Sequence, residues 1–297
     1  MTSMEFNLFL PQMRLPFDQL VARARAAEAA GFVGITGMDH LAPPQAEDQP
    51  MFEAIVTTTW LAAHTERLQV GSLVLCDAFR TPATLARQAV SIDHASRGRY
   101  ELGIGWGSVR DEFITFGVGS IEPRERVDRL RETLEVVTAL WTGEVVDYDG
   151  RYHTLRRAQQ QPLPLGRIPI VIGGTGRKTL ALVREFADWW NVHVGDIHKL
   201  EDLRSQVGDA RVSIQQMVAL VGRGDDREAI AAQANRRFGY SHPVVGSAAE
   251  LVNHYGRLSE QGIERVYTWF CDFAPPETIL EFGEEVIAPL GGKAWQP

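Results

Sequence analysis

Cysteine is scarce in this sequence of 297 residues, which holds two, Cys76 and Cys271. Both lie in apolar, strand-like segments, which favours buried thiols in a reducing compartment over a disulfide. No apolar run is long enough to span a bilayer. The N-terminus MTSMEFNLFLPQ lacks the basic residues that open a signal peptide. We therefore expect a cytoplasmic protein with no membrane partner.

An excess of positive charge is also missing. The chain has 30 Lys and Arg against 38 Asp and Glu, a formal net charge of -8. This balance argues against nucleic acid or a membrane surface as a general partner. The 8 histidines are scattered, without H-E-x-x-H or Cys/His spacing, so we expect no bound metal. The G-x-S-x-G motif of a hydrolase nucleophile is absent as well.

What the sequence does contain is a strict alternation of short β-like runs and amphipathic segments of helical length. The β-like runs cover residues 6–10, 34–37, 69–75, 100–104, 168–172, 189–194, 213–221 and 265–270. The helical segments cover residues 17–30, 51–65, 82–96, 124–141, 178–187, 200–207, 226–237 and 248–261. Alternating units predict a parallel sheet with helical crossovers, and eight of them favour a closed (β/α)₈ TIM barrel. The spacing alone leaves an open, doubly wound sheet as the alternative.

One segment interrupts the alternation, at about residues 143–167, between the helix that follows strand four and strand five. It contains an Asp149-Gly150 turn, then Pro162 and Pro164. This pattern predicts a β-hairpin and an extended loop, inserted into one barrel domain that covers residues 1–297. A last helix, at 277–287, falls outside the eight units.

Candidate site residues were sought where barrel enzymes hold them, at the carboxyl ends of the strands. Strand two ends in GITGMDHL, which presents Asp39 and His40. The free pKa of histidine lies near neutrality, so His40 is the candidate for proton transfer or for a hydrogen bond to a bound ring. The alternative is a histidine that satisfies a loop carbonyl. Asp39 is the candidate to orient His40, although neighbours on extended backbone often point apart.

Strand four ends in GIGWGS, with glycines at 103, 105 and 107. This is G-x-G-x-G rather than the dinucleotide pattern G-x-G-x-x-G, so a Rossmann site is not indicated. Bare backbone here leaves room for a flat or phosphorylated ligand. Trp106 can stack on such a ligand or simply pack, and Glu112 is either an acid or a residue that begins a helix.

Strand five ends in IPIVIGGTGRKT, which lacks the glycine spacing of an NTPase phosphate loop. Gly173, Gly174 and Gly176 allow a tight turn, and a helix begins at about Arg177. The free amides of a helix start favour an anion, and an ordinary turn between strand and helix is the alternative.

Many segments in order carry a resemblance over nearly the whole chain, among them FNLFLPQ, ARAAEAAGFVGITGMDHL, RTPATLARQAVSIDHASRGRYELGIGWG and PIVIGGTGRKTLALVREFADWWNV. The sequence resembles the bacterial-luciferase-like monooxygenase family, and most of all the branch that uses the deazaflavin coenzyme F420. The resemblance implies a (β/α)₈ barrel with a large insertion and, often, a homodimer.

The resemblance also implies a flavin-type ring at the mouth of the barrel, with His40 beside it. A non-prolyl cis peptide at Ser72-Leu73 would lie behind the ring. The phosphate would be cradled by Gly173, Gly174, Thr175 and Gly176. The residues that the resemblance and the strand ends together mark for cofactor binding are Ser72, Leu73, Gly105, Trp106, Gly107, Gly173, Gly174, Thr175 and Gly176.

Two positions depart from the sugar-phosphate dehydrogenases of that branch. Ser108 stands where they have an acidic residue, and Pro44 stands where they have a tryptophan. We therefore do not expect a sugar-phosphate substrate.

The expected function is hydride transfer between F420 and a small organic substrate, which the sequence does not identify. The alternatives are an FMN-dependent monooxygenase that uses O₂, a non-catalytic flavin-binding protein, and a phosphate-binding lyase without a flavin.

Overall fold

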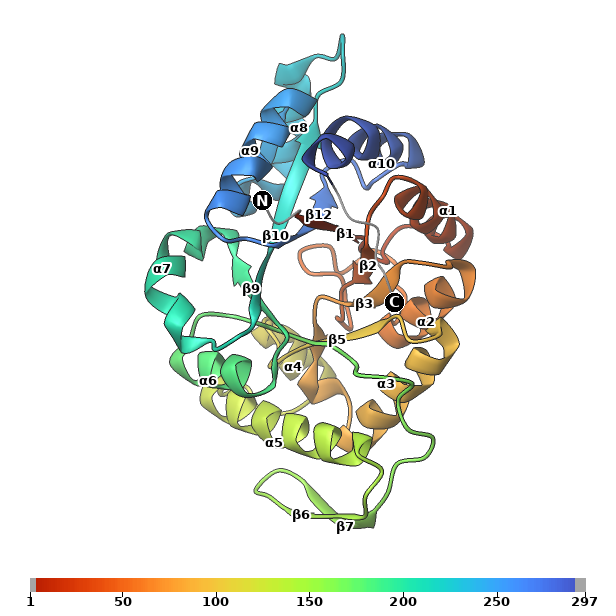
Figure 1. The fold of residues 1–297 in the computed structure, drawn as a ribbon, viewed down its shortest axis with the longest axis vertical. Coiled ribbons are helices and arrows are strands. Elements are labelled where there is room, and N and C mark those ends of the chain that lie inside the picture. The colour runs from red at the N-terminus through yellow and green to blue at the C-terminus, as the bar shows by residue number, and fades with distance from the viewer. Residues whose placement is uncertain (1–3, 292–297) are drawn as a thin grey trace.

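A computed structural model describes residues 4–291. Eight parallel strands form a closed ring in which each strand pairs with the next and the last pairs with the first. The strands are β1 (Glu5–Phe9), β2 (Gly34–Gly37), β3 (Gln69–Ser72), β5 (Tyr100–Gly105), β8 (Ile170–Gly173), β9 (Trp189–His193), β10 (Arg211–Leu220) and β12 (Arg265–Phe270). The predicted TIM barrel is confirmed, and the open sheet is wrong (Figure 1).

Helices surround the ring of strands on its outside (Figure 1). They are α1 (Phe17–Ala29), α2 (Ala54–His64), α3 (Pro82–Ser96), α4 (Arg110–Phe116), α5 (Pro123–Trp141), α6 (Arg177–Phe186), α7 (Leu200–Leu203), α8 (Arg227–Phe238), α9 (Ala248–Glu260) and α10 (Pro276–Phe282). None of the helices within residues 4–291 is both long and apolar enough to cross a membrane. The core lies between the barrel and the helices, where side chains such as Leu130, Leu134 and Val137 of α5 are fully buried.

Three helical segments differ from their prediction. The segment 200–207 forms only one α-helical turn, α7, flanked by 3₁₀ turns. Leu200 is the one buried residue of α7, so this turn has little apolar contact to extend it. The final helix ends as α10 at Phe282 and continues as a wider turn through Gly283–Ile287. For α4 the sequence offered only Glu112 as a residue that begins a helix, one of two alternatives, and the structure places Glu112 in the first turn of this helix.

Two further strands lie beside the barrel strands, β4 (Leu75–Cys76) and β11 (Val244–Gly246). β4 arises because the predicted strand 69–75 is broken after Ser72. The break carries a non-prolyl cis peptide at Leu73-Val74, so the predicted position, Ser72-Leu73, is wrong by one bond. The amide of Leu73 still donates to the carbonyl of Gly37 at 2.9 Å, which keeps the Ser72-Leu73 peptide within the strand ladder.

The predicted hairpin is present between α5 and β8, as the antiparallel pair β6 (Val146–Asp149) and β7 (Thr154–Ala158). Figure 1 shows it beyond α5, away from the barrel. Glu132 of α5 accepts hydrogen bonds from the amides of Arg151, Tyr152 and His153, which fixes the hairpin turn to the helix.

Ionic side chains fill the end of the barrel where the strands begin. Arg265 of β12 is buried and pairs with Glu101 of β5 and Glu5 of β1, each at 2.7 Å. The Tyr267 hydroxyl group lies 3.1 Å from Glu101, and Arg265 also lies over the ring of Trp189. Buried charges need such complete pairing, and here they close the amino-terminal end of the barrel. The carboxyl end remains for ligands.

Candidate functional site

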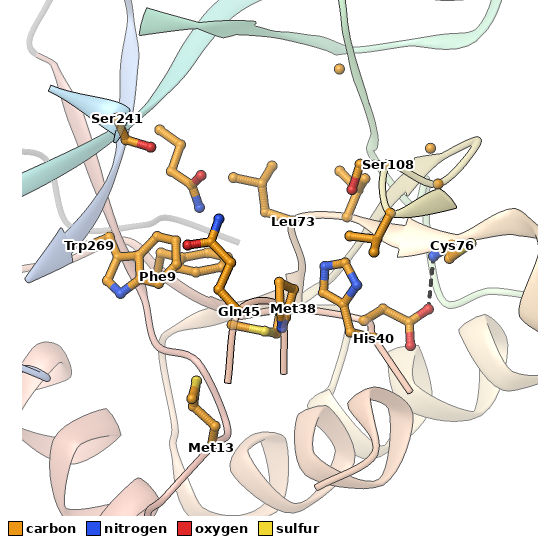
Figure 2. Close-up of a pocket in the computed structure, with 18 of the residues that line it drawn as sticks. Phe9, Met13, Met38, His40, Gln45, Leu73, Cys76, Ser108, Ser241 and Trp269 are labelled. Carbon is orange, nitrogen blue, oxygen red and sulfur yellow. Dashed lines mark hydrogen bonds between the residues drawn. The ribbon is translucent and has the colours of Figure 1, made fainter. Parts of the chain in front are cut away.

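The carboxyl ends of the strands open into a cavity of about 650 Å³ (Figure 2). Most of the predicted site residues line it, namely Asp39, His40, Leu73, Gly105, Trp106, Gly107, Gly173 and Gly174. Thr175 and Gly176 follow Gly174 directly and lie outside the lining, and Ser72 is buried behind Leu73. The structure therefore brings residues from four separate strand ends to one place.

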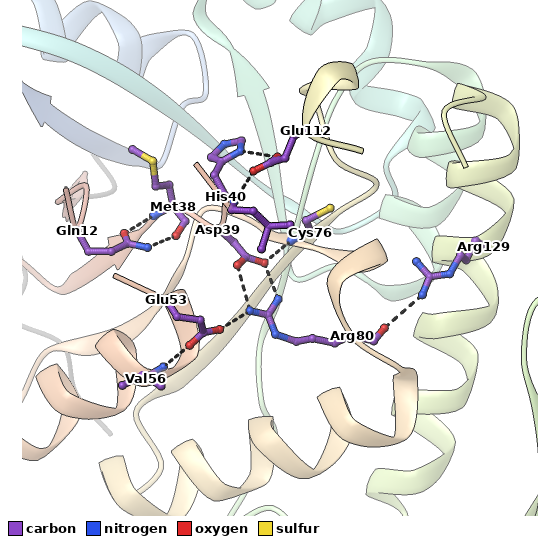
Figure 3. Close-up of polar contacts among 11 residues, drawn as sticks. Gln12, Met38, Asp39, His40, Glu53, Val56, Cys76, Arg80, Glu112 and Arg129 are labelled. Atoms are coloured by element: carbon purple, nitrogen blue, oxygen red, sulfur yellow. Dashed lines mark hydrogen bonds and ion pairs between the residues drawn. The ribbon is translucent and has the colours of Figure 1, made fainter. Parts of the chain in front are cut away.

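His40 is held by Glu112, a residue of α4 (Figure 3). The Nδ1 atom of His40 lies 3.0 Å from Oε2 of Glu112, whose other oxygen accepts from the amide of Leu41. Burial raises the pKa of Glu112, but hydrogen bonds from His40 and from the amides of Leu41 and Ala42 outweigh it, so this pKa lies below its usual value. An ionised carboxylate only accepts hydrogen bonds, so Nδ1 carries the proton and Nε2 is the nitrogen left for a ligand.

The lowered pKa of Glu112 also links the site to stability. The folded value lies below that of the unfolded chain, which is about 4.3 for a free glutamate. The contacts of Glu112 therefore stabilise the fold above that pH, and the stabilisation is lost as the pH falls through the folded value.

Asp39 does not make the contact with His40 that the sequence suggested. Its two carboxylate oxygens accept from Arg80 at 2.6 and 3.0 Å, and one also accepts from the amide of Cys76 at 2.8 Å (Figure 3). Successive side chains on extended backbone point to opposite sides, which explains why Asp39 and His40 diverge. Asp39 fixes the chain at β4, and Glu112 takes the place beside the imidazole.

Cys76 lines the cavity but is not poised as a nucleophile. Burial raises the pKa of its thiol to about 12, so the group stays protonated near neutral pH. Cys76 and Cys271 are both free and buried, as their apolar surroundings in the sequence predicted.

Glycines make one wall of the cavity from bare backbone. A Cβ atom added to Gly105 would lie 2.8 Å from Cγ2 of Val74. Gly107 has a φ of +83°, and a Cβ there would meet the ring of Phe113 at 2.5 Å. Trp106 lies between these glycines, and the Arg126 guanidinium carbon lies 4.7 Å from the centre of its ring. This wall can accept the flat face of a ligand because no side chain of Gly105 or Gly107 projects from it.

The loop after β8 has some backbone amides that are already hydrogen-bonded and others that are free to bind an anion. Gly174 has a φ of +118°, and its amide donates to the carbonyl of Asn191 at 3.1 Å, so that amide is already used. The Thr175 hydroxyl group donates to Asp196 at 3.3 Å. Helix α6 begins after Gly176, which has no side chain to cap it. The first amides of α6, rather than the amide of Gly174, are therefore the donors placed to hold an anion.

The opposite wall is apolar and was not predicted from the sequence. Figure 2 shows Phe9 and Trp269 together on the side of the cavity away from His40. Their ring centres are 4.8 Å apart, and Met13 and Met38 lie near them. These residues lie at or just beyond the ends of β1, β2 and β12. At these positions, the pattern of apolar and polar residues in the sequence did not indicate which side chains face a ligand.

Metal ligands are not gathered at this site. Within residues 4–291, no group of three or more His, Cys, Asp or Glu side chains could hold a metal ion.

A barrel with these features at its carboxyl end matches a known family. Residues 4–265 match the family described as luciferase-like monooxygenase, and the chain belongs to that family.

Among curated relatives, the chain is similar to an F420-dependent glucose-6-phosphate dehydrogenase of Mycolicibacterium fortuitum, with 36% identity over 160 residues. That match covers 53% of this chain and 48% of the relative. An F420-dependent hydroxymycolic acid dehydrogenase of Mycobacterium tuberculosis is 30% identical over 230 residues, which cover 74% of this chain and 63% of the relative. The chain thus spans about half of the first relative and less than two thirds of the second.

Solved structures share the fold at lower identity. An F420-dependent secondary alcohol dehydrogenase in complex with an F420-acetone adduct superposes with a TM-score of 0.81 at 17% identity, covering 97% of this chain and 99% of that chain. An F420-dependent tetrahydromethanopterin reductase from Methanopyrus kandleri gives a TM-score of 0.77 at 17% identity, with the same coverage of 97% and 99%.

Proposed function

We propose that this protein is an oxidoreductase that moves a hydride between coenzyme F420 and a small organic substrate. The observation that carries the proposal is the joint lining of one cavity by His40, held through Nδ1 by Glu112, and by the bare backbone of β5 and β8. The F420-dependent relatives support the choice of cofactor.

The residues present fit a planar ring with an anionic tail. Gly105 and Gly107 supply a wall where a side chain would collide with its neighbours, and the uncapped start of α6 supplies amides for a phosphate. When bound, the coenzyme supplies a carbon centre that accepts or releases a hydride. The protein has to orient the ring, position the substrate and manage one proton.

We assign the proton transfer of the reaction to His40. Its Nε2 atom exchanges a proton with the substrate atom that gains or loses one. Glu112 keeps Nδ1 protonated, fixes the ring orientation and stabilises the charged imidazole. The apolar wall of Phe9, Met38 and Trp269 excludes water from the reacting atoms. Asp39 acts through its contacts with Arg80 and Cys76, as a positioning residue for the loop that carries His40.

The substrate is proposed not to be a sugar phosphate. Ser108 and Pro44 both line the cavity, at the positions where the resemblance expects an acidic residue and a tryptophan. A sugar also needs many hydrogen-bond partners, whereas Met13, Met38 and Trp269 offer mainly apolar surface.

An equilibrium titration with F420 and with FMN tests the cofactor. We expect F420 to bind at least about tenfold more tightly than FMN, as read from the absorbance or fluorescence of each cofactor. Tight FMN binding without F420 binding would favour an FMN-dependent monooxygenase. Binding of neither ring would favour a flavin-free phosphate-binding lyase, and F420 binding without turnover of any donor would favour a non-catalytic carrier.

We also propose a cytoplasmic homodimer in which residues 1–297 form one domain. An apolar row on and before α2 supports the dimer: Phe52, Val56 and Trp60 are 39%, 59% and 47% exposed. Phe17 of α1 stacks on Phe52 at 4.3 Å and extends the same surface. Exposed apolar side chains that gather in this way mark an interaction surface. Two free, buried thiols agree with a reducing compartment.

The double substitution Val56→Glu and Trp60→Glu is expected to convert the dimer to a monomer, because it places charge in the centre of this surface. Sedimentation velocity measures the change. Leu280→Glu is the matched control, since Leu280 of α10 is 45% exposed but lies elsewhere, and it should leave the dimer intact. A monomeric wild type, or a doubly substituted protein that remains dimeric, would contradict this interface.

A further inference from the structure

Two arginines at the mouth of the cavity have no acidic partner. Arg14 follows β1, Arg237 lies near the end of α8, and both line the cavity. Neither takes part in an ion pair within the described residues. Arg237 donates to the carbonyl of Cys271 at 2.7 Å, which holds its side chain without neutralising its charge.

The guanidinium groups of Arg14 and Arg237 both lie against the same aromatic ring, that of Phe273. The guanidinium carbons of Arg14 and Arg237 lie 5.7 and 5.1 Å from the centre of the Phe273 ring. Stacking of this kind holds a guanidinium group in place and leaves its edge free for hydrogen bonds. Arg237 uses part of its edge on two neutral acceptors, the carbonyl of Cys271 and the side-chain oxygen of Gln233, and its remaining N–H donors are left for a ligand.

The backbone at this point is fixed in a conformation that side-chain-bearing residues rarely adopt. The φ angles of Arg14 and Phe273 are +62° and +66°. Arg14 is held there by a hydrogen bond from its amide to the carbonyl of Pro50 at 2.9 Å. The carbonyl of Phe273 accepts from Nε of Arg23 at 3.0 Å. Such backbone outliers persist where surrounding contacts enforce them, and they gather at ligand sites.

The acidic groups around the cavity are already engaged. Asp39 pairs with Arg80, and Glu112 binds His40. Asp272, next to Phe273, accepts from the amide of Ala274 and from the hydroxyl group of Thr278. These neutral donors do not cancel the charge of Asp272, but Asp272 lies near a third arginine, Arg23. Among the described residues, Arg14 and Arg237 therefore still leave the mouth near Phe273 positively charged, in a chain whose formal net charge is -8.

This positive charge is far from the place proposed for the cofactor phosphate. In the closed ring of eight strands, β1, which precedes Arg14, lies opposite β8, which precedes the start of α6. Phe9 and Trp269 lie on the side of the cavity away from His40 (Figure 2), and Met13, which precedes Arg14 in the chain, belongs to the same apolar cluster. The cavity thus has a positively charged mouth and an apolar wall in addition to His40. A ligand with an apolar body and an anionic group, separate from the cofactor phosphate, would match these surfaces.

We propose that the substrate is an apolar organic acid whose carboxylate pairs with Arg14 and Arg237, and whose body lies along Phe9 and Trp269 toward His40. The inference deepens the proposed function and rests on it, because the reacting part of the acid must reach the hydride-transfer site. Arginine suits this task because its planar fork matches the geometry of a carboxylate.

Two probes with the same apolar body test the proposal, 4-phenylbutanoate and 4-phenyl-1-butanol. Binding of each to the F420-loaded protein is measured by isothermal titration calorimetry. We expect the acid to bind about tenfold more tightly than the alcohol, a preference of the size that partly exposed, charge-assisted contacts give.

Matched variants distinguish a specific effect of Arg14 and Arg237 from the general effect of removing a positive charge near the cavity. In the double variant Arg14→Gln and Arg237→Gln, the preference for the acid should disappear while the affinity for the alcohol is unchanged. Arg236→Gln removes the same charge one residue away on α8, at a position outside the cavity lining, and should keep the preference. The single variants Arg14→Gln and Arg237→Gln should each lose part of it, and circular dichroism verifies that every variant is folded.

Three results would overturn the proposal: equal binding of acid and alcohol to the wild type, binding of neither probe, or an unchanged preference in the double variant. A separate F420 titration of each variant should give the wild-type affinity. A loss of F420 affinity in the double variant, with no loss for the acid, would assign the arginines to the cofactor tail instead. Failure of the wild type to bind F420 would count against the proposed function itself, whatever the two probes show.

Discussion

Replacing His40 with alanine is expected to lower kcat by about 10²- to 10⁴-fold, the range that general acid–base catalysis contributes. The dissociation constant of F420 should change by less than about threefold, because the expected contacts of the cofactor are with the glycine wall and the start of α6. Single-turnover kinetics with F420 and a fluorescence titration measure the two quantities. A variant that turns over at the wild-type rate would remove His40 from the mechanism.

Glu112 provides the control for this prediction because its proposed effect on catalysis passes through His40. Glu112→Gln keeps one oxygen that can accept from Nδ1, but it removes the charge and the second acceptor oxygen that the amide of Leu41 uses. We therefore expect a smaller loss in kcat than for His40→Ala, on the order of tenfold. The double variant His40→Ala and Glu112→Gln should be no slower than His40→Ala alone. Losses that simply multiply would show that Glu112 acts independently of the imidazole.

Replacing Gly176 with aspartate should have opposite effects on cofactor binding and on stability. An Asp carboxylate at this helix start accepts hydrogen bonds from the first amides of α6, which stabilises helices slightly. The same carboxylate occupies the amides proposed for the cofactor phosphate and repels its charge. We expect F420 affinity to fall by at least about tenfold, while Tm is unchanged or slightly raised.

The local geometry makes Gly176 the right glycine for this experiment. Its φ of -69° suits any residue, and an added Cβ would have Thr179 Oγ1 as its nearest neighbour, at 3.8 Å. Gly174, with a φ of +118°, would be strained by any side chain, so a loss there would have two causes. Gly176→Ala is the control and should bind F420 much as the wild type does. If Gly176→Asp also kept wild-type affinity, the anion would have to bind elsewhere.

The strand order and most helix bounds could be predicted from the sequence because their signals are local. Helix α3 begins at Pro82 as predicted, since Thr81 caps it and the proline suits the first turn. Helix α4 gave only a weak signal, the acidic residue Glu112 near its start, because the helix is short and its start at Arg110 has no side-chain cap.

The polar partners within the site could not be predicted, for a different reason. Glu112 and His40 are separated by 72 residues and meet only because the loops after β2 and β5, two strands with β3 between them, open at the same end of the closed barrel. Likewise, Arg14 and Phe273 come from two separate loops and Arg237 from the end of α8, and no spacing pattern relates them. Sequence patterns report on periodicity along one segment, whereas these contacts depend on how separate segments are placed in space.

The buried ionic cluster of Arg265, Glu101 and Glu5 has a kinetic consequence. Because the cluster closes the far end of the barrel, the proposed function has cofactor and substrate both entering at the carboxyl end. It then predicts that the ligand that lies deeper binds first and leaves last, which is a compulsory order of binding and release. A slowly dissociating outer ligand would then trap the inner one.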